Sequence, residues 1–419
     1  MNPFLIIILA AIILEYAIDL VANLLNLKAL IFEVPDALKG LYKPEEYRNS
    51  QLYTRSVTSF SIVASSFRLA LLLAFWFGGG FNYLDRFIRS WGLLPIANGL
   101  FYIGILLLGY SLITLPLSIY ATFVIEERFG FNRTTPVTFI TDRLKGLALA
   151  LLLGTPLLAI VLALFEYAGN YAWLCCWAAI TVFSLGLQFI APTWIMPLFN
   201  KFTPMEPGEL KEAILQYAHS VKFPVKNVLV MDGSKRSSKS NAFFTGFGRN
   251  KRIALFDTLI EKHSVGELVA VLAHEIGHYK KRHILQGTVI GILHAGVILF
   301  LLSIFIDKPG LFEAFYMDEQ SIYTGLLFFG LLYTPVELIL SIVLQVISRK
   351  NEYQADRFAA ATTVEPQNLA SALKKLSADH LSNLTPHPFY VFLNYSHPPL
   401  LQRLEAIKKY RGAGYDLVT

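Results

Sequence analysis

Long apolar runs separated by polar segments dominate the chain. A membrane-spanning helix needs about 20 mainly apolar residues. Seven segments have that character, at residues 3–27, 59–81, 94–120, 146–166, 171–198, 284–306 and 321–347. The pattern therefore predicts a mostly α-helical, polytopic membrane protein. We expect membrane helices 1 to 5 in residues 1–199, a soluble core in 200–283, helices 6 and 7 in 284–347, and a soluble C-terminal segment in 348–419.

The composition supports a membrane protein and excludes several other classes. Of the 419 residues, 54% are hydrophobic and only 16% are charged, whereas soluble domains carry about 25% charged residues. Low charge excludes a disordered chain as well as an ordinary soluble enzyme. The two cysteines, Cys175 and Cys176, are adjacent within an apolar run. They form neither a disulfide framework nor a thiolate zinc site.

The distribution of basic residues predicts the orientation in the membrane. With the N-terminus outside, the two short inside loops carry nine Lys and Arg residues, and the outside loops carry three. The positive-inside rule then places residues 200–283 and 348–419 in the cytoplasm. The first apolar run is read as a retained span, because the first basic residue is Lys28 and a signal peptide would begin with positive charge. The net charge of +6 follows from this topology, so no nucleic-acid partner is expected.

Residues 274–278, His-Glu-Ile-Gly-His, form the strongest chemical motif. On a helix, His274 and His278 lie on one face and can bind one metal ion. Glu275 lies beside them, where it can activate a water molecule and carry its proton to a leaving amine. Ser264 and Glu267 have the spacing of a capping box, which predicts that a helix begins there. The alternative is a chance match on a surface helix.

A zinc site needs a further protein ligand, and the topology indicates where it lies. Two spans follow the motif, so the chain returns to the same side of the membrane at residue 348. Glu352 and Asp356 are again four residues apart on a predicted helix. Glu352 would complete a catalytic site of two histidines and one glutamate, with a position left for water. Asp356 would accept a hydrogen bond from a ligand histidine. Alternatively, both are solvated surface carboxylates.

Two further segments fit a site that binds a peptide. Residues 227–231, 241–248 and 252–256 read as strands, the last two joined as a hairpin through residues 249–251. A free strand edge can hold an extended peptide, and Ser240 and Asn241 begin that edge. His397 precedes a proline pair and a predicted terminal helix over residues 400–410, and it could stabilise an oxyanion. An ordinary hairpin and a surface capping histidine are the alternatives.

Together these segments resemble the integral-membrane zinc CAAX prenyl endopeptidases of type I. The resemblance extends over nearly the whole chain. Its blocks, in order, are Glu126-Glu127-Arg128-Phe129-Gly130-Phe131-Asn132, Pro192-Thr193-Trp194, Pro197-Leu198-Phe199, Ser240-Asn241-Ala242, Lys251-Arg252-Ile253, Phe256-Asp257-Thr258-Leu259, the histidine motif, Glu352-Tyr353-Gln354-Ala355-Asp356 and Ser396-His397-Pro398-Pro399.

The resemblance implies a fold, a cofactor and roles for individual residues. It implies seven helices around a water-filled chamber, with a gluzincin-type zinc domain, carrying a small β-hairpin, on the cytoplasmic side. One Zn²⁺ per chain would be bound by His274, His278 and Glu352, with Glu275 and His397 catalytic and Asp356 supporting a ligand. Asn241 and Ala242 would bind substrate.

The resemblance also implies a substrate, and it leaves alternatives open. The expected activity is cleavage near the C-terminus of a prenylated CAAX-type peptide or lipidated protein at a lipid membrane. A short loop at residues 307–320 and a C-terminus without a retrieval signal favour a bacterial inner-membrane protein over one of the endoplasmic reticulum. The alternatives are a quality-control zinc protease without a prenyl requirement and a seven-span receptor or transporter.

Overall fold

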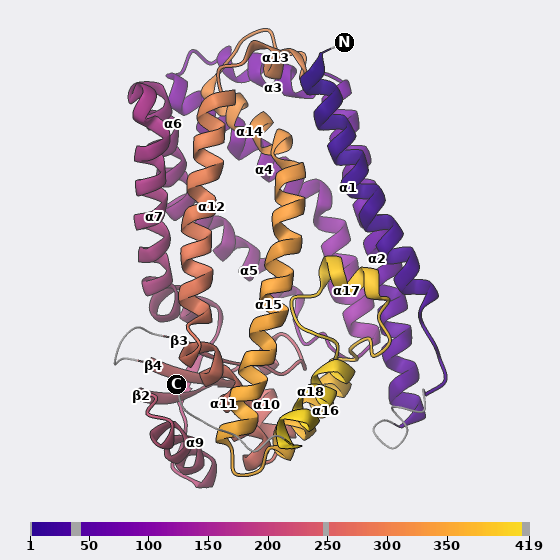
Figure 1. The fold of residues 1–419 in the computed structure, drawn as a ribbon. Helices are drawn as coiled ribbons and strands as arrows, with labels where there is room; N and C mark the ends of the chain where they lie inside the picture. The colour runs from indigo at the N-terminus through magenta and orange to yellow at the C-terminus, as the bar shows by residue number, and fades with distance from the viewer. Residues whose placement is uncertain (1, 35–42, 246–250, 413–419) are drawn as a thin grey trace.

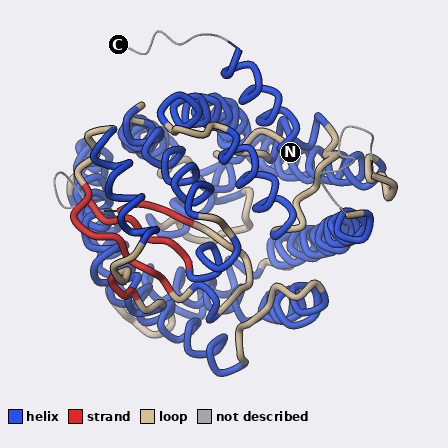
Figure 2. Tube along the Cα trace, turned by 90° about the horizontal axis from the view of Figure 1, so that it is seen from below, coloured by secondary structure: helices blue, strands red, loops and turns tan. Residues whose placement is uncertain are grey.

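The computed structural model describes residues 2–34, 43–245 and 251–412. Figure 1 shows two parts: a tall ring of long helices and, at its lower end, a smaller unit with a β-sheet. Viewed from below, the strands have helices around them (Figure 2). The mostly helical, polytopic fold is as predicted.

The ring is made of long helical segments, several of them built from consecutive helices. They are α1 (Pro3–Lys28), α2 (Pro44–Phe77), α4 (Pro95–Tyr120) with η2 (Ala121–Glu126), α5 (Pro136–Leu149) with η3 (Ala150–Gly154) and α6 (Thr155–Tyr167), α7 (Ala172–Ile190) with η5 (Ala191–Ile195) and α8 (Met196–Phe199), α12 (His283–Phe305), α14 (Ile322–Leu332) and α15 (Thr334–Thr362). Among the described residues, six helices are long and apolar enough to cross a membrane, and α14 with α15 makes a seventh.

The seventh span, predicted over residues 321–347, is broken within that range. Helices α14 and α15 meet at an angle of 53°. Pro335 stands in the first turn of α15, where its ring cannot donate a backbone hydrogen bond and would collide with the preceding turn of a continuous helix. The bend lets α15 leave the ring and continue as one helix as far as the soluble unit.

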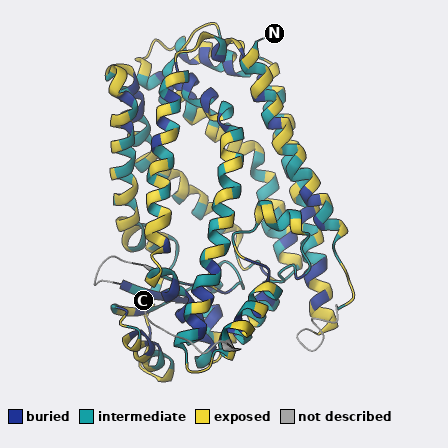
Figure 3. Ribbon diagram, in the orientation of Figure 1, coloured by how far each residue is buried: buried dark blue, intermediate teal, exposed yellow. Residues whose placement is uncertain are grey.

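The ring helices bury little of their own surface. In the most apolar 18-residue window of the six uninterrupted spans, only 6% to 17% of the residues are buried, and Figure 3 shows exposed and half-buried positions along these helices. A close-packed bundle would bury a full stripe of each helix. The helices therefore surround a chamber that their side chains do not fill.

The upper end of the chamber is closed by a packed aromatic cluster. There α3 (Gly80–Arg89) and α13 (Pro309–Glu313) cross the top of the ring (Figure 1). Phe315 stacks on Phe328 with ring centroids 3.9 Å apart, and Trp76 stacks on Phe315 at 4.5 Å. The indole N–H of Trp76 donates to the backbone oxygen of Ala314. This cluster joins helices that are far apart in the sequence.

The soluble unit is built on a four-stranded mixed sheet. Its strands are β1 (Phe202–Pro204), β2 (Val225–Met231), β3 (Ala242–Thr245) and β4 (Lys251–Phe256), in the order β1-β2-β4-β3. Strands β2 and β4 are parallel, and the other neighbours are antiparallel. The predicted hairpin is therefore part of a larger sheet. The last part of the predicted strand 241–248, at residues 246–248, and the predicted tip at residues 249–250 lie outside the described residues.

Helices cover this sheet and connect it to the ring. They are α9 (Glu209–Ser220), α10 (Asp257–Lys262), α11 (Val265–Lys280), α16 (Gln367–Asp379), α17 (Pro388–Asn394) and α18 (Leu400–Gly412). Helix α11 packs in the hydrophobic core with Ile253 and Leu255 of β4. Both hydrogen bonds of the predicted capping box at Ser264 and Glu267 are present. The motif helix thus begins where the sequence predicts.

Candidate active site

The two motif histidines and Glu352 converge, although Glu352 is far away in the sequence. The Nε2 atoms of His274 and His278 lie 3.1 Å apart on one face of α11. Helix α15 returns from the ring and packs against α11, which places Glu352 Oε2 3.4 Å from His274 Nε2 and Oε1 3.3 Å from His278 Nε2. The three potential ligand atoms lie within 4.8 Å of one another. The geometry is the one that the predicted ligand set requires.

The chemistry of this group fits a divalent cation. Glu352 is 3% exposed, and its Oε2 has no hydrogen-bond partner among the described residues. The outer nitrogens are engaged instead: His274 Nδ1 is 2.9 Å from Asp356 Oδ1, and His278 Nδ1 is 3.0 Å from His283 Nδ1. The inner nitrogens face Glu352. Two imidazole nitrogens and a carboxylate at this spacing are the donor set typical of catalytic zinc.

Arg403 is a central residue of the site that no sequence motif indicates. It donates two hydrogen bonds to Asp356, of 2.8 and 2.6 Å, and its Nη1 lies 3.5 Å from Glu352 Oε2. Asp356 has no exposed surface. Arg403 therefore balances the charge of two buried carboxylates. The available signal was its place on α18, between Leu400 and Ile407 on one helix face.

His283 also belongs to the site, and the sequence did not predict its contacts. The Nε2 of His283 lies 3.1 Å from Oε1 of Gln354, and its Nδ1 faces His278. His283 thereby connects the start of α12 to α15. It orients His278 in the way that Asp356 orients His274.

Glu275 and His397 flank the convergent group. Glu275 lines the same cavity as His274 and Glu352, and burial raises the pKa of its carboxyl group, an effect that the two neighbouring histidines oppose. His397 comes from the loop between α17 and α18. Its Nε2 lies 3.3 Å from Glu352 Oε1, and its side chain is 63% exposed. The structure thus brings both residues to the place where a reacting carbonyl would lie, and their catalytic roles stay predictions.

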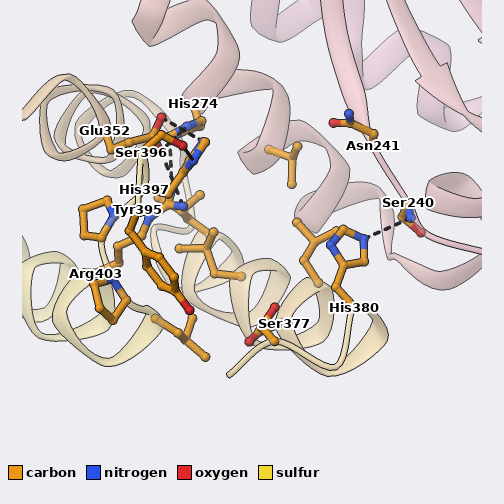
Figure 4. A pocket seen from close by; sticks show the side chains of 18 of the residues that line it. Ser240, Asn241, His274, Glu352, Ser377, His380, Tyr395, Ser396, His397 and Arg403 are labelled. Carbon is orange, nitrogen blue, oxygen red and sulfur yellow. Dashed lines mark hydrogen bonds and ion pairs between the residues drawn. The ribbon is translucent and has the colours of Figure 1, made fainter. Parts of the chain in front are cut away.

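The free edge of the sheet runs along the other side of the cavity. The backbone N–H of Phe256 donates to the oxygen of Asn241. Since neighbouring residues of a strand direct their backbone groups to opposite sides, Ala242 and Phe244 present theirs at the free edge of β3. The side-chain oxygen of Asn241 accepts from the N–H of Ala242. Figure 4 shows Asn241 across the cavity from His274 and His397. Substrate binding by Asn241 and Ala242 stays a prediction.

The segment at residues 126–132 anchors this edge to the ring. Lys239 Nζ donates to Glu126 Oε2 at 2.9 Å and to the Tyr53 hydroxyl, which itself donates to Glu126 Oε1. The N–H of Ser238 donates to the oxygen of Phe131. The segment that leads into β3 is therefore held by α2 and by the end of η2.

The cavity that contains these residues has a volume of about 560 Å³. Figure 4 shows His274, Glu352 and His397 at one end and Ser377 and His380 at the other. Glu275, Ser382 and Asn383 also line the cavity. This volume lies in the range of sites for small molecules and peptide segments. The site is thus a metal-binding group beside a peptide-sized cavity and a free strand edge.

Comparisons with known proteins place this architecture in a family. Residues 23–201 match the model "CAAX prenyl protease N-terminal, five membrane helices", and residues 204–411 match "Peptidase family M48". The chain belongs to peptidase family M48. CAAX prenyl protease 1 of Saccharomyces cerevisiae is 37% identical over 90% of this chain and 88% of that protein. The human CAAX prenyl protease 1 homolog is 36% identical with the same coverage.

A solved structure agrees with the fold as a whole. The crystal structure of Ste24p from S. mikatae superposes with a TM-score of 0.93 at 35% identity, covering 97% of this chain and 99% of that chain. The predicted family, fold class and enzyme class are confirmed: the chain is a membrane-embedded metalloprotease, not a receptor or transporter. That it is a multi-pass membrane protein is also established.

Proposed function

We propose that this M48 peptidase cleaves peptide bonds near the C-terminus of prenylated CAAX-type substrates, with one Zn²⁺ per chain. The observation that carries the proposal is the buried group of His274, His278 and Glu352 beside a peptide-sized cavity. The names of the relatives support the substrate class. We assign the three residues as zinc ligands and Asp356 as the hydrogen-bond partner that orients His274.

Zinc at this site would supply Lewis-acid catalysis, polarising the scissile carbonyl and lowering the pKa of water. Glu275 accepts a proton from the attacking water and later donates it to the leaving amine nitrogen. A raised pKa suits this exchange, because the carboxyl must both accept and release a proton. His397 donates a hydrogen bond to the oxygen of the scissile carbonyl. The edge of β3 pairs with the substrate backbone, and Asn241 turns its side chain to do so.

The orientation and the division of the chain belong to the same proposal. The basic inside loops favour a cytoplasmic site. Residues 200–283 and 348–419 would then act together as the catalytic unit, since α11 and α15 supply its ligands. The short loop at residues 307–320 favours a bacterial inner membrane, and the eukaryotic relatives support the alternative, the endoplasmic reticulum.

The test compares a farnesylated CAAX peptide with its unprenylated twin. Wild type, Glu275→Gln and the exposed control Glu261→Gln are purified, their zinc content is measured, and the products are mapped by mass spectrometry. We expect cleavage three residues from the C-terminus, a loss of at least about 10³-fold in turnover for Glu275→Gln with zinc retained, and no loss for Glu261→Gln. Full activity in Glu275→Gln would refute the mechanism.

The same assay separates the quality-control alternative. Equal cleavage of both peptides, still dependent on Glu275, would show a zinc protease that has no prenyl requirement. A strong preference for the farnesylated peptide supports the CAAX assignment.

A further inference from the structure

The active-site cavity has a second polar end, away from the zinc ligands. Ser377 and His380 lie there, at the end of α16 and just after it, with Ser382 and Asn383. Figure 4 shows this end beside Ser240, across the cavity from His274, Glu352 and His397. The proposed mechanism uses none of these four residues. Their arrangement therefore needs its own explanation.

Ser377 is a buried hydroxyl without a partner. The residue is 8% exposed, and its Oγ makes no hydrogen bond within the part of the chain that the structure describes. Serine on a helix commonly bonds to the carbonyl one turn earlier, as Ser220 does to Tyr217. An unsatisfied buried hydroxyl costs free energy. A ligand in the cavity would remove that cost.

His380, near Ser377, offers a hydrogen-bond donor whose orientation is fixed. Its Nε2 lies 3.0 Å from the backbone nitrogen of Ser240 and accepts that N–H. Burial, aided by the charge of Lys239, lowers the pKa of His380, so the neutral ring carries its proton on Nδ1. Figure 4 shows this other ring nitrogen on the cavity side. His380 is thereby set as a hydrogen-bond donor.

The middle of the cavity is aliphatic. Figure 4 shows aliphatic side chains between the two polar ends, and the aliphatic residues of the lining include Leu259, Val271, Leu369, Leu373 and Leu376. From the zinc ligands outward, the cavity thus offers a metal site, an apolar wall and a pair of donors. Both carboxylates of the lining, Glu275 and Glu352, lie at the metal end within the described residues. The far end is suited to an anion.

That order matches the C-terminus of a CAAX chain, which has two aliphatic residues, a final residue and a free carboxylate after the cysteine. Three extended residues span about 10 Å. A peptide added antiparallel to β3 would run with its C-terminal part towards Ser240, whose N–H is bonded to His380. Two positive charges, of Lys239 and Lys262, and one negative charge, of Asp379, act on His380 at this end, and Asp379 is paired with Lys262 at 3.5 Å.

We propose that Ser377 and His380 bind the C-terminal carboxylate of the substrate, and that the aliphatic wall binds the two preceding side chains. This site rests on the proposed function. It explains why cleavage would occur at a set distance from the chain end: the carboxylate is held at one end of the cavity while the scissile bond lies at the other. Ser377 and His380 are substrate-binding residues with no part in the proton transfers.

The experiment uses one farnesylated CAAX peptide made with a free C-terminal carboxylate and again with a carboxamide. Steady-state kinetics are measured for the full-length zinc enzyme, for Ser377→Ala and His380→Gln, and for the control Ser220→Ala. Zinc content and the unfolding midpoint are recorded for each. In wild type, the carboxamide should raise KM by roughly tenfold, since it loses a hydrogen-bonded charge, with kcat changed much less.

The variants test the named residues. Ser377→Ala and His380→Gln should raise KM for the carboxylate peptide by roughly three- to tenfold and should change KM for the carboxamide little. Ser220→Ala should change neither. Equal KM for the two peptides in wild type would overturn the site while leaving zinc-dependent cleavage, and thus the proposed function, intact. Equal losses on both peptides in the variants would also overturn it. The wild-type comparison decides the point even if a variant fails to fold.

Discussion

Helix α11, which carries the histidine motif, and helix α12 belong to regions of opposite packing. Helix α11 buries nine of its 16 residues, including His274. Helix α12, which follows it directly, buries four of 23. Both segments form regular α-helices, so helix formation alone does not decide how many residues of a helix are buried. The catalytic unit is built as a close-packed core, and the ring is built as a wall around open space.

This difference determines where a charge can serve catalysis. In the catalytic unit, Glu352 and Asp356 are buried and held by Arg403 and the histidines. In the ring, Glu337 is 52% exposed and has a contact with His294 at 3.3 Å. A buried network fixes the geometry of its members and strengthens their interactions. The exposed pair of Glu337 and His294 has neither a fixed geometry nor strengthened interactions. Four predictions test this contrast, in order of the expected effect.

Removing Arg403 should cause the largest loss. Arg403→Ala leaves Asp356 and Glu352 buried without their cation, which should cost about 3–5 kcal/mol of stability. It should also lower zinc content, because Asp356 orients His274. Arg403→Lys should retain part of the stability and part of the zinc content, because lysine keeps the positive charge. The measurements are the thermal unfolding midpoint and metal content in detergent, with the exposed Arg357→Ala as a control. A stable Arg403→Ala with full zinc would contradict the assigned network.

A pair of glycines compares the packing of the two regions directly. A Cβ on Gly277 of α11 would lie 3.0 and 3.1 Å from backbone atoms of Ala355, whereas a Cβ on Gly287 of α12 meets nothing within 4 Å. Gly277→Ala should therefore destabilise by about 1–3 kcal/mol. Gly287→Ala should be neutral or stabilise by up to about 1 kcal/mol. Unfolding midpoints of the two variants check this, and similar shifts would refute the contrast.

The buried capping residue Glu267 gives the catalytic unit a pH dependence. Burial opposes its ionisation, but hydrogen bonds from Lys375, Ser371 and the Ser264 backbone lower its pKa to about 2. Since that pKa lies below the ordinary 4.5, ionised Glu267 stabilises the fold fully above about pH 4.5 and loses this effect as the pH falls towards 2. Because Lys375 is half exposed, solvent screening reduces the contribution to on the order of 1 kcal/mol.

The test follows unfolding of wild type and Glu267→Gln from pH 7 to pH 3. The wild type should be more stable at pH 7, and the gap should narrow as the pH decreases below about 4.5. A gap that stays constant with pH would show that packing, and not ionisation, accounts for the effect of Glu267.

The smallest effect is expected in the ring. Glu337→Gln removes one charge from an exposed pair with His294 and should change stability by less than about 1 kcal/mol. Zinc content should be unchanged, because the pair lies in the chamber wall. Substrate handling is measured alongside. Loss of zinc in Glu337→Gln would show that ring and catalytic unit are coupled far more tightly than the packing indicates.

Local signals in the sequence predicted much of this molecule. Apolar length gave seven spans, and the capping box gave the start of α11 at Ser264. The spacing of His274 and His278 predicted a shared face, and the return of the chain predicted where Glu352 would lie. Strand β1 was missed because it is only three residues long and ends in a proline, Pro204.

Other features depended on contacts between distant residues. Arg403 is 47 positions from Asp356, and Lys239 is 113 from Glu126. Residues 377 and 380 lie in a segment with ordinary helical composition, so nothing in it marks a cavity.

The sequence by itself determined the membrane spans, the helix that carries the motif and the chemistry of the metal ligands, because each depends on residue type and spacing along one element. Only the tertiary structure decided which side chains meet across elements: the ion pair of Arg403 and Asp356, the anchoring of β3 to the ring, and the polar end of the cavity at Ser377 and His380. The physical reason is that helix and strand periodicity fixes only near neighbours, whereas packing brings together residues whose separation in sequence carries no periodic signal.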